Sequence, residues 1–163
     1  MYRGQYGPMR EKVIQAAREL GLEVDVTTLE VPTRTVPEAA AAVGCQAAEI
    51  AKSIVFVADG EPVLAIASGA HRVDPEKLCE TLDCAEVRQA APDEVRAATG
   101  FPVGGVPPFG HALPVVLDEA LLLNERVWAA GGDGNTLFEV DPRKLADRVG
   151  ARIAPIAALD GSG

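Results

Sequence analysis

The stretch KSIVFVADGEPVLAIAS, residues 52–68, predicts a β-hairpin near the middle of the chain. Two apolar runs flank the dipeptide Asp59-Gly60, which is a strong signal for a tight turn between antiparallel strands. The first run is apolar at four successive positions, 54–57, so both faces of that strand carry apolar side chains. Because a strand with one wet face alternates apolar and polar residues, this strand is expected in the middle of a sheet that is covered on both sides.

Segments on either side of the hairpin have the periodicity and the end signals of helices. Residues 9–20 repeat apolar side chains at helical spacing up to Gly21. Thr35 and Glu38 have the spacing of a capping box and predict a short helix that ends at Gly44. Proline at the start predicts three further helices, over residues 76–82, 93–99 and 143–149.

Other segments read as strands, at residues 23–31, 114–118, 126–130 and 136–140. The last three follow one another, and the glycine-rich segment GGDGN joins the final pair, so this part is expected to be antiparallel. The chain has no internal repeat. Together the pattern predicts an α/β (α+β) fold in one domain over residues 1–163, with a mixed sheet flanked by helices and a frayed tail at 159–163.

Composition sets limits on the class of protein. The chain has 163 residues, 48% hydrophobic and 24% charged, which is ordinary for one globular domain. The net charge of −9 argues against wrapping a long nucleic acid, though a strand end could still be recognised through a few contacts. No membrane-length apolar run and no signal peptide is evident, so a cytoplasmic protein is expected. Accordingly Cys45, Cys79 and Cys84 are expected to be reduced thiols, and the two histidines lack the spacing of metal ligands.

The segment TGFPVGGVPPFGH, residues 99–111, contains four glycines and three prolines. Gly104 and Gly105 let the backbone approach a ligand without a Cβ clash, while Pro107 and Pro108 fix the shape of the loop and have no N–H to donate. The remaining amide donors belong to Gly104, Gly105, Val106, Phe109 and Gly110. A rigid set of amide donors suits a carbonyl oxygen or a developing oxyanion, but a structural crossover loop explains the same composition. The spacing excludes a phosphate-binding P-loop and a Rossmann fingerprint.

Few side chains outside this loop suggest chemistry. Lys52, at the mouth of the most apolar strand, must reach solvent, pair with a partner or point into a cleft. Ser53 beside it lacks a nucleophile-elbow sequence. His111, the last residue of the loop, could be a general base or make a structural hydrogen bond. GGDGN, residues 131–135, could line a ligand site or form a turn. Trp128 is expected in the core or at its rim.

The segments AKSIVFVADGEPVLAIASG, RVDPEKL, TGFPVGGVPPFGH and AAGGDGN, in this order, resemble the YbaK/EbsC/prolyl-tRNA synthetase-associated editing-domain family. The resemblance runs over residues 45–157, and its most specific part is the pairing of the G-x-x-x-P motif, Gly104 to Pro108, with Lys52. It implies a free-standing trans-editing hydrolase that deacylates mischarged tRNA, commonly tRNA(Pro) charged with the wrong amino acid by prolyl-tRNA synthetase. It also implies a mixed, strongly curved sheet and neither a metal nor an organic cofactor.

The resemblance further implies roles for single residues. Lys52 would orient the terminal adenosine of the tRNA, with Arg72 and Arg34 as further phosphate contacts. Backbone N–H groups of Gly104, Gly105 and Val106 would hold the scissile carbonyl. The nucleophile would be a bound water, a ribose hydroxyl or the substrate's own side chain. Substrate-binding positions implied in this way are Ser53, Pro107, Pro108, Phe109, Gly110, His111, Gly132 and Asp133.

Two departures from the family pattern bear on the amino acid removed. The stretch TTLEVPTRT, residues 27–35, lacks a tyrosine that cysteine-editing members carry, and Ala129 or Ala130 stands in place of their serine. With His111, these departures favour a branch that handles alanine, serine or another small residue over a cysteine-specific one. Two alternatives stay open: a non-catalytic module that binds tRNA 3′ ends or a synthetase, and an unrelated enzyme that uses Lys52 as an amine nucleophile.

Overall fold

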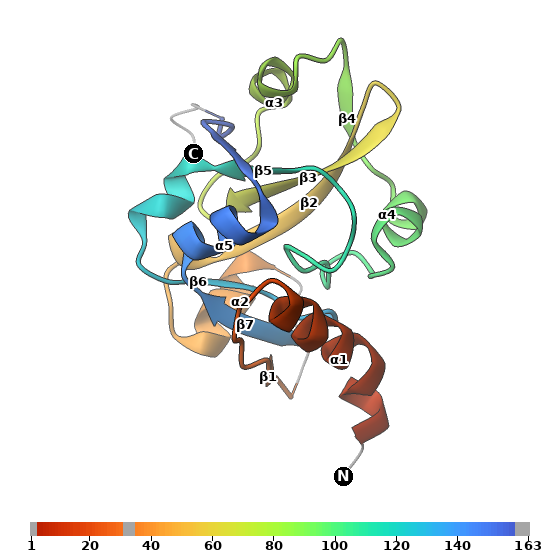
Figure 1. Ribbon diagram of the computed structural model, residues 1–163. Coiled ribbons are helices and arrows are strands. Elements are labelled where there is room, and N and C mark those ends of the chain that lie inside the picture. Colours follow the sequence, from red (N-terminus) through yellow and green to blue (C-terminus); the bar gives the residue numbers. More distant parts are fainter. Residues whose placement is uncertain (1–2, 31–34, 159–163) are drawn as a thin grey trace.

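The central hairpin forms where the Asp59-Gly60 dipeptide predicts it. The computed structural model describes residues 3–30 and 35–158, and in it β2 (Ala51–Ala58) and β3 (Glu61–Ser68) pair antiparallel over their full length (Figure 1). Asp59 and Gly60 have φ angles of 48° and 84°, so both adopt the left-handed conformation that a type I′ turn requires.

The strands divide between two sheets. The larger one has the order β4-β2-β3-β5-β8, with β4 at Val87–Gln89, β5 at Val115–Asp118 and β8 at Arg152–Ala154. The smaller one has the order β1-β7-β6, with β1 at Thr27–Thr28, β7 at Thr136–Val140 and β6 at Val127–Ala130. β5 runs parallel to both of its neighbours, and the other pairs are antiparallel. An isolated parallel bridge between Ile50 and Trp128 connects the two sheets.

These sheets correct three expectations from the sequence. The strands form two sheets instead of one, and residues 114–118 join the larger sheet in parallel instead of continuing an antiparallel run. Within residues 23–30 only Thr27 and Thr28 are paired, because β7 offers partners to no more than these two. β4 and β8 were not predicted, since three residues carry too little periodicity. The strong curvature stays a prediction, and the tail at 159–163 lies outside the described residues.

The helices are α1 (Arg3–Glu19), α2 (Val36–Val43), α3 (Pro75–Leu82), α4 (Pro92–Thr99) and α5 (Pro142–Val149), with 3₁₀ turns η1 (Ala47–Glu49) and η2 (Glu119–Leu123). Four helices begin at the predicted capping box or prolines, whereas α1 begins at Arg3, six residues before the predicted segment, and the two 3₁₀ turns were not predicted. The capping box is confirmed: the Glu38 N–H donates to the Thr35 hydroxyl at 3.2 Å, and the Thr35 N–H donates to the Glu38 carboxylate at 3.1 Å.

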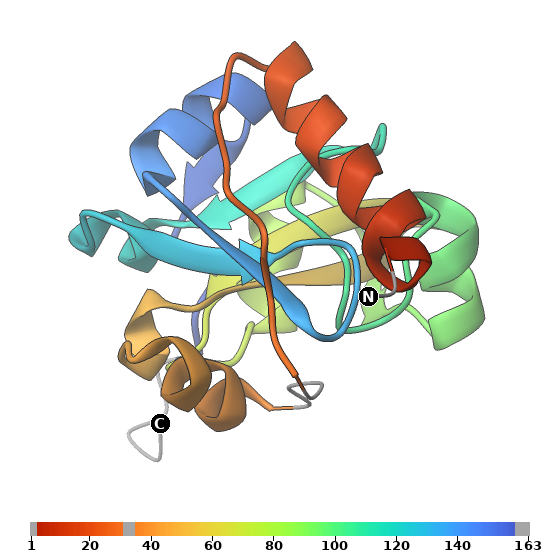
Figure 2. The same ribbon diagram turned by 90° about the horizontal axis from the view of Figure 1, so that it is seen from below.

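Both faces of the larger sheet are covered, as the apolar run at 54–57 predicts (Figure 2). One face packs against α1, α4, α5 and the smaller sheet, and the other packs against α3. α2 lies on the smaller sheet in a separate cluster. The result is a mixed α/β fold in a single domain. β4 pairs with β2 only at residues 56–58, so residues 52–54 have no strand on that edge within the described chain.

Candidate active site

A cavity of about 160 Å³ lies where the two sheets separate. Pairing between β2 and β6 stops at the bridge of Ile50 and Trp128, within the described residues, and the cavity opens just beyond it. Its lining comes from α2, the start of β2, the 99–111 loop and the smaller sheet: Thr35, Val36, Ala39, Ile50, Ala51, Lys52, Ser53, Gly104, Val106, Trp128, Ala130 and Leu137. The structure thus brings four of the expected site residues, Lys52, Ser53, Gly104 and Val106, to one place.

Lys52 borders two cavities at once. It lies on the same face of β2 as Ile54 and Phe56, and with them it lines a second groove of about 650 Å³. Arg72 lies in that groove too, with Val73, Asp74, Pro75, Gln89 and Ala158. Burial, and then the positive charge of Arg72, lower the pKa of Lys52. Among the described residues, no carboxylate forms an ion pair with Lys52 or with Arg72. The positive charges of these two side chains favour an anion between them.

Ser53 contributes polar groups on the opposite face of β2. Its hydroxyl is buried and has no hydrogen-bond partner among the described residues. The Ala90 N–H donates to the Val55 carbonyl at 2.9 Å, so the backbone groups of Val55 point away from β3. Because this direction alternates along an antiparallel strand, the N–H and C=O of Ser53 point the same way, toward the edge where β2 lacks a neighbour. A buried hydroxyl left unpaired costs about 1–3 kcal/mol, which makes a bound ligand or water its natural partner.

Buried anchors hold the 99–111 loop at both ends. At its start Thr99 accepts the N–H of Phe101 at 3.0 Å, and the fully buried Phe101 ring lies under Lys12, whose Nζ is 5.1 Å from the ring centroid. At its end Phe109 packs against Phe138 with ring centroids 5.5 Å apart. The loop is therefore a packed element of the fold. Contacts of Phe101 and Phe109 with the rest of the protein restrain it, in addition to its prolines.

The middle of the loop lies against the second glycine-rich segment. A Cβ on Gly105 would lie 2.7 Å from the carbonyl oxygen of Gly132 and 3.0 Å from the Cα of Asp133, so only glycine fits there. Asp133 closes its own turn, since its carbonyl accepts both the N–H and the hydroxyl of Thr136 at 3.2 and 3.0 Å. Burial raises the pKa of Asp133. Gly132 and Asp133 do not line the cavity beside Lys52; they support the loop that does.

The loop amides are not equivalent. The Gly105 N–H donates to the Pro102 carbonyl at 2.9 Å, so this amide, one of the three expected substrate donors, already closes a turn inside the loop. The N–H groups of Gly104 and Val106 have no acceptor among the described residues, and both residues line the 160 Å³ cavity. Gly104 has a φ of 88°, a conformation that favours glycine. Two amides therefore remain for a ligand oxygen.

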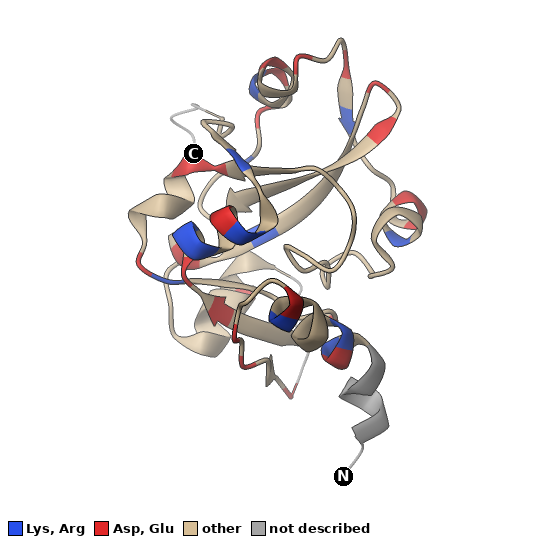
Figure 3. Cartoon of the chain, in the orientation of Figure 1, with Lys and Arg blue, Asp and Glu red and all other residues tan. Residues whose placement is uncertain are grey.

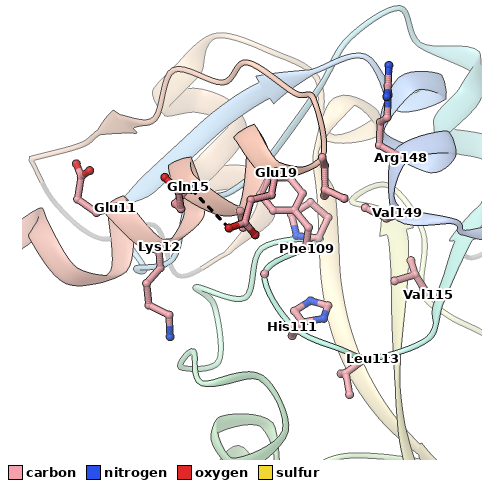
Figure 4. A pocket seen from close by; sticks show the side chains of 14 residues that line it. Glu11, Lys12, Gln15, Glu19, Phe109, His111, Leu113, Val115, Arg148 and Val149 are labelled. Atoms are coloured by element: carbon pink, nitrogen blue, oxygen red, sulfur yellow. Dashed lines mark hydrogen bonds between the residues drawn. The ribbon is translucent and has the colours of Figure 1, made fainter.

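His111 lies at a different cavity. A cleft of about 760 Å³ runs between α1, the end of α5 and residues 108–115, and shares no lining residue with the cavity beside Lys52 (Figure 4). It contains four of the predicted site residues, Pro108, Phe109, Gly110 and His111. The His111 Nε2 lies 3.1 Å from the Pro107 carbonyl and must carry the hydrogen, because a carbonyl only accepts. Burial lowers the pKa of His111, against the opposing effect of this bond, so the ring favours its neutral form.

Several lining residues were missed by sequence reasoning. Val36 and Ala39 of α2 and Leu137 of β7 make up part of the apolar wall, and Trp128, expected at the core or its rim, is half-buried beside them. The only signal that could have found them is the apolar run of α2 and the single tryptophan in the chain. Arg34, a predicted phosphate contact, lies outside the described residues.

Charged side chains are spread over the helices and the hairpin ends (Figure 3). In the described part of the chain, no three His, Cys, Asp or Glu side chains come close enough together to hold a metal ion. None of the helices described is both long and apolar enough to cross a bilayer.

Comparison with known proteins agrees with the resemblance read from the sequence. The model of the aminoacyl-tRNA editing domain matches residues 30–147. The uncharacterized protein YwhH of Bacillus subtilis (strain 168) is 37% identical over 128 residues, which are 77% of this chain and 81% of YwhH. A crystal structure of a candidate trans-editing enzyme for prolyl tRNA synthetase superposes with a TM-score of 0.88 at 41% identity, covering 93% of this chain and 98% of that one.

The proline–tRNA ligase of Solidesulfovibrio magneticus is 40% identical over 109 residues, 66% of this chain. That segment is 19% of the ligase, so this chain corresponds to one part of a much longer enzyme.

Proposed function

Because the chain belongs to the aminoacyl-tRNA editing domain family, we propose that it is a trans-editing hydrolase that deacylates mischarged aminoacyl-tRNA. The proposed substrate is tRNA(Pro) that carries cysteine, alanine or another small amino acid, with prolyl-tRNA synthetase as a partner in the cytoplasm. Residues 1–163 would act as one editing domain with a strongly curved sheet. Similarity to a candidate trans-editing enzyme for prolyl tRNA synthetase and to proline–tRNA ligases supports this assignment.

One observation carries the proposal: Lys52 lies at the junction of two cavities, beside loop amides that have no acceptor in the described chain. The smaller cavity would receive the aminoacyl group, and the 650 Å³ groove would receive the terminal nucleotide. Lys52 and Arg72 would contact its phosphate or hydroxyl groups, since two neighbouring cations favour an anion between them.

The reaction breaks the ester bond between the carbonyl carbon of the amino acid and the terminal ribose oxygen of the tRNA. The attacking atom is the oxygen of a bound water or a ribose hydroxyl, or the oxygen or sulfur of the substrate's own side chain. It adds to that carbon, and negative charge develops on the carbonyl oxygen. The N–H groups of Gly104 and Val106 would stabilise this charge, and loss of one such donor typically costs about 3 kcal/mol of barrier. With water as the nucleophile, the products are a free amino acid and a free ribose hydroxyl.

The walls of the smaller cavity favour a small, uncharged side chain. Val36, Ala39, Trp128 and Leu137 are apolar, and among the described residues no carboxylate or guanidinium lines the cavity. Ser53 adds one buried hydroxyl that the substrate's polar groups could satisfy. The shape of a pocket changes the binding free energy of two substrates that differ by one methylene by only about 1–3 kcal/mol. We therefore expect several small amino acids to be accepted as substrates.

The test is a deacylation assay with tRNA(Pro) carrying cysteine, alanine or serine, followed by loss of the ester. We expect turnover of at least one of these, and a decrease of about 100-fold in Lys52→Ala because the ester loses its orientation. Lys144→Ala is the matched control, since Lys144 is exposed on α5 and lines none of the cavities described here.

Three outcomes would contradict this assignment. Binding of tRNA without ester loss would indicate a non-catalytic module. Equal activity in Lys52→Ala and Lys144→Ala would remove Lys52 from the site. A borohydride-trapped adduct on Lys52 with a carbonyl compound would indicate an amine nucleophile instead of a positioning group.

A further inference from the structure

The end of α3 brings two cysteines together. Asp83 follows the helix in the left-handed conformation, with a φ of 56°. The Cys84 N–H donates to the Cys79 carbonyl at 3.1 Å, and the Asp83 N–H donates to the Glu80 carbonyl at 3.3 Å. These two bonds define a Schellman ending, in which the residue after the left-handed one folds back over the last turn and its side chain commonly contacts the residue five positions earlier. Here both of these residues are cysteines.

The Cys79 thiol lies against the backbone of Cys84. The Cys79 Sγ lies 2.7 Å from the Cys84 carbonyl oxygen, and both side chains are half-buried. The hydrogen bond with the Cys79 thiol, followed by burial, raises the pKa of Cys84 to about 11. The helix end as it stands therefore already places the Cys79 thiol beside Cys84.

The segment after Cys84 is also fixed in place. The Asp59 carboxylate in the hairpin turn accepts the N–H groups of Ala85 and Glu86, at 3.1 and 3.0 Å. The Asp59 N–H donates back to the Glu86 carbonyl at 3.0 Å. The turn that carries Cys84 is thus attached to the hairpin turn of the larger sheet, which holds Cys84 against the end of α3.

We propose that Cys79 and Cys84 form a dithiol site for thiol–disulfide exchange with small disulfides of the glutathione class. The third cysteine, Cys45, packs in the separate cluster under α2 and takes no part. In the first step one cysteine thiolate attacks a sulfur of oxidised glutathione and displaces one glutathione thiolate. In the second step the other cysteine thiolate attacks the protein sulfur of this mixed disulfide and displaces the second glutathione. The protein loses two electrons and two protons, and one glutathione disulfide becomes two thiols.

The bridge would brace one wall of the groove beside Lys52. Asp74 and Pro75 at the start of α3 and Gln89 at the end of β4 line that groove. Cys79 lies in the last turns of α3, and Cys84 lies in the connection from α3 to β4. A short closed loop over residues 79–84 restricts the unfolded chain, so the oxidised protein is expected to unfold at a higher temperature.

The experiment exposes the native protein to oxidised glutathione, alkylates the remaining thiols and counts them by mass spectrometry. We expect the three free thiols to fall to one, on Cys45, with a mass lower by about 2 Da before alkylation and no glutathione attached. Cys45→Ser should form the same bridge. Cys79→Ser and Cys84→Ser should each retain a bound glutathione, because the second thiol that releases it is missing.

The same reaction in concentrated urea shows whether the bridge forms because of the folded turn or only because the two cysteines are five residues apart in the sequence. Bridge formation relative to mixed disulfide should fall at least about tenfold when the chain is unfolded, because the folded turn raises the effective concentration of one thiol near the other. A stable glutathione adduct on the native wild-type protein, a bridge that includes Cys45, or equal bridging in urea would each overturn the proposal. None of these results depends on deacylase activity.

Discussion

The 99–111 loop has two sides with opposite character. On the side of Lys52 it presents Gly104 and Val106, whose amides have no acceptor in the described chain, to a cavity of about 160 Å³. On the side of α1 it presents Phe109 and His111 to a cleft of about 760 Å³, where the imidazole already has the Pro107 carbonyl as a partner.

The two cavities therefore differ in which polar groups lack a partner, since in the larger cleft this is only the buried Nδ1 of His111 among the described lining residues. The smaller cavity combines a cation whose pKa is lowered, a buried hydroxyl without a partner and two available amides. Polar groups that the fold leaves unpaired cost stability, so their convergence points to a ligand that completes them. Cavity size by itself would instead favour the cleft beside His111.

Gly105→Ala should have the largest effect on this comparison, because it pushes the loop away from the segment that supports it. The new methyl group would lie 2.7 Å from the Gly132 carbonyl oxygen, and backbone on both sides has little room to move. We expect a loss of about 2–3 kcal/mol in the free energy of unfolding, measured in urea, together with a large loss of deacylation.

Gly134→Ala is the matched control, since its methyl group would meet no atom of the described residues within 4 Å. Its free energy of unfolding should change by less than about 1 kcal/mol. If both variants are equally stable, the close contact between the two glycine-rich segments does not hold the loop in place.

His111→Asn tests the other side of the loop through pH. Burial lowers the pKa of His111 from its ordinary 6.5, so below about that pH the unfolded chain binds a proton that the folded protein resists. The wild-type protein should thus lose more stability than the variant as the pH falls from 7 toward 5, measured by urea unfolding at each pH. Above pH 7 the imidazole is neutral in both states, and the difference between the two proteins should stay constant.

Deacylation by the same variant sharpens the comparison. Measured per folded molecule at pH 7.5, it should decrease much less than in Lys52→Ala. A decrease as large as that of Lys52→Ala would mean that the two sides of the loop serve one site.

The smallest expected effect is spectroscopic. Trp128 is the only tryptophan and lines the cavity beside Lys52, so a ligand there should shift or quench its emission. A non-hydrolysable aminoacyl-adenosine analogue, with an amide in place of the ester, should produce this change in a saturable titration. The change should be absent in Trp128→Phe and weakened in Lys52→Ala. Saturable binding by calorimetry without any change in emission would place the ligand in another cavity.

Sequence reasoning succeeded wherever a few neighbouring residues decide the structure. The structure confirms the Asp59-Gly60 turn, the Thr35 capping box and the prolines that open α3, α4 and α5. Each of these features depends only on residues no more than four positions away in the sequence. Sequence reasoning failed where partners come from distant segments. Within the predicted strand at 23–31, only Thr27 and Thr28 are described as paired with β7. The direction of β5 follows from its pairing with β3 and β8, which the sequence does not show.

By itself, the sequence determined the hairpin, the helix ends and the composition of the 99–111 loop, because these depend on local backbone preferences. The resemblance to the editing-domain family added the pairing of Lys52 with the loop glycines. The tertiary structure decided which loop amides remain available, since the Gly105 amide bonds to Pro102 while its Cα lies against Gly132. It also decided that His111 lies apart from Lys52, because residues on opposite sides of one packed loop line different cavities however close they are in the chain.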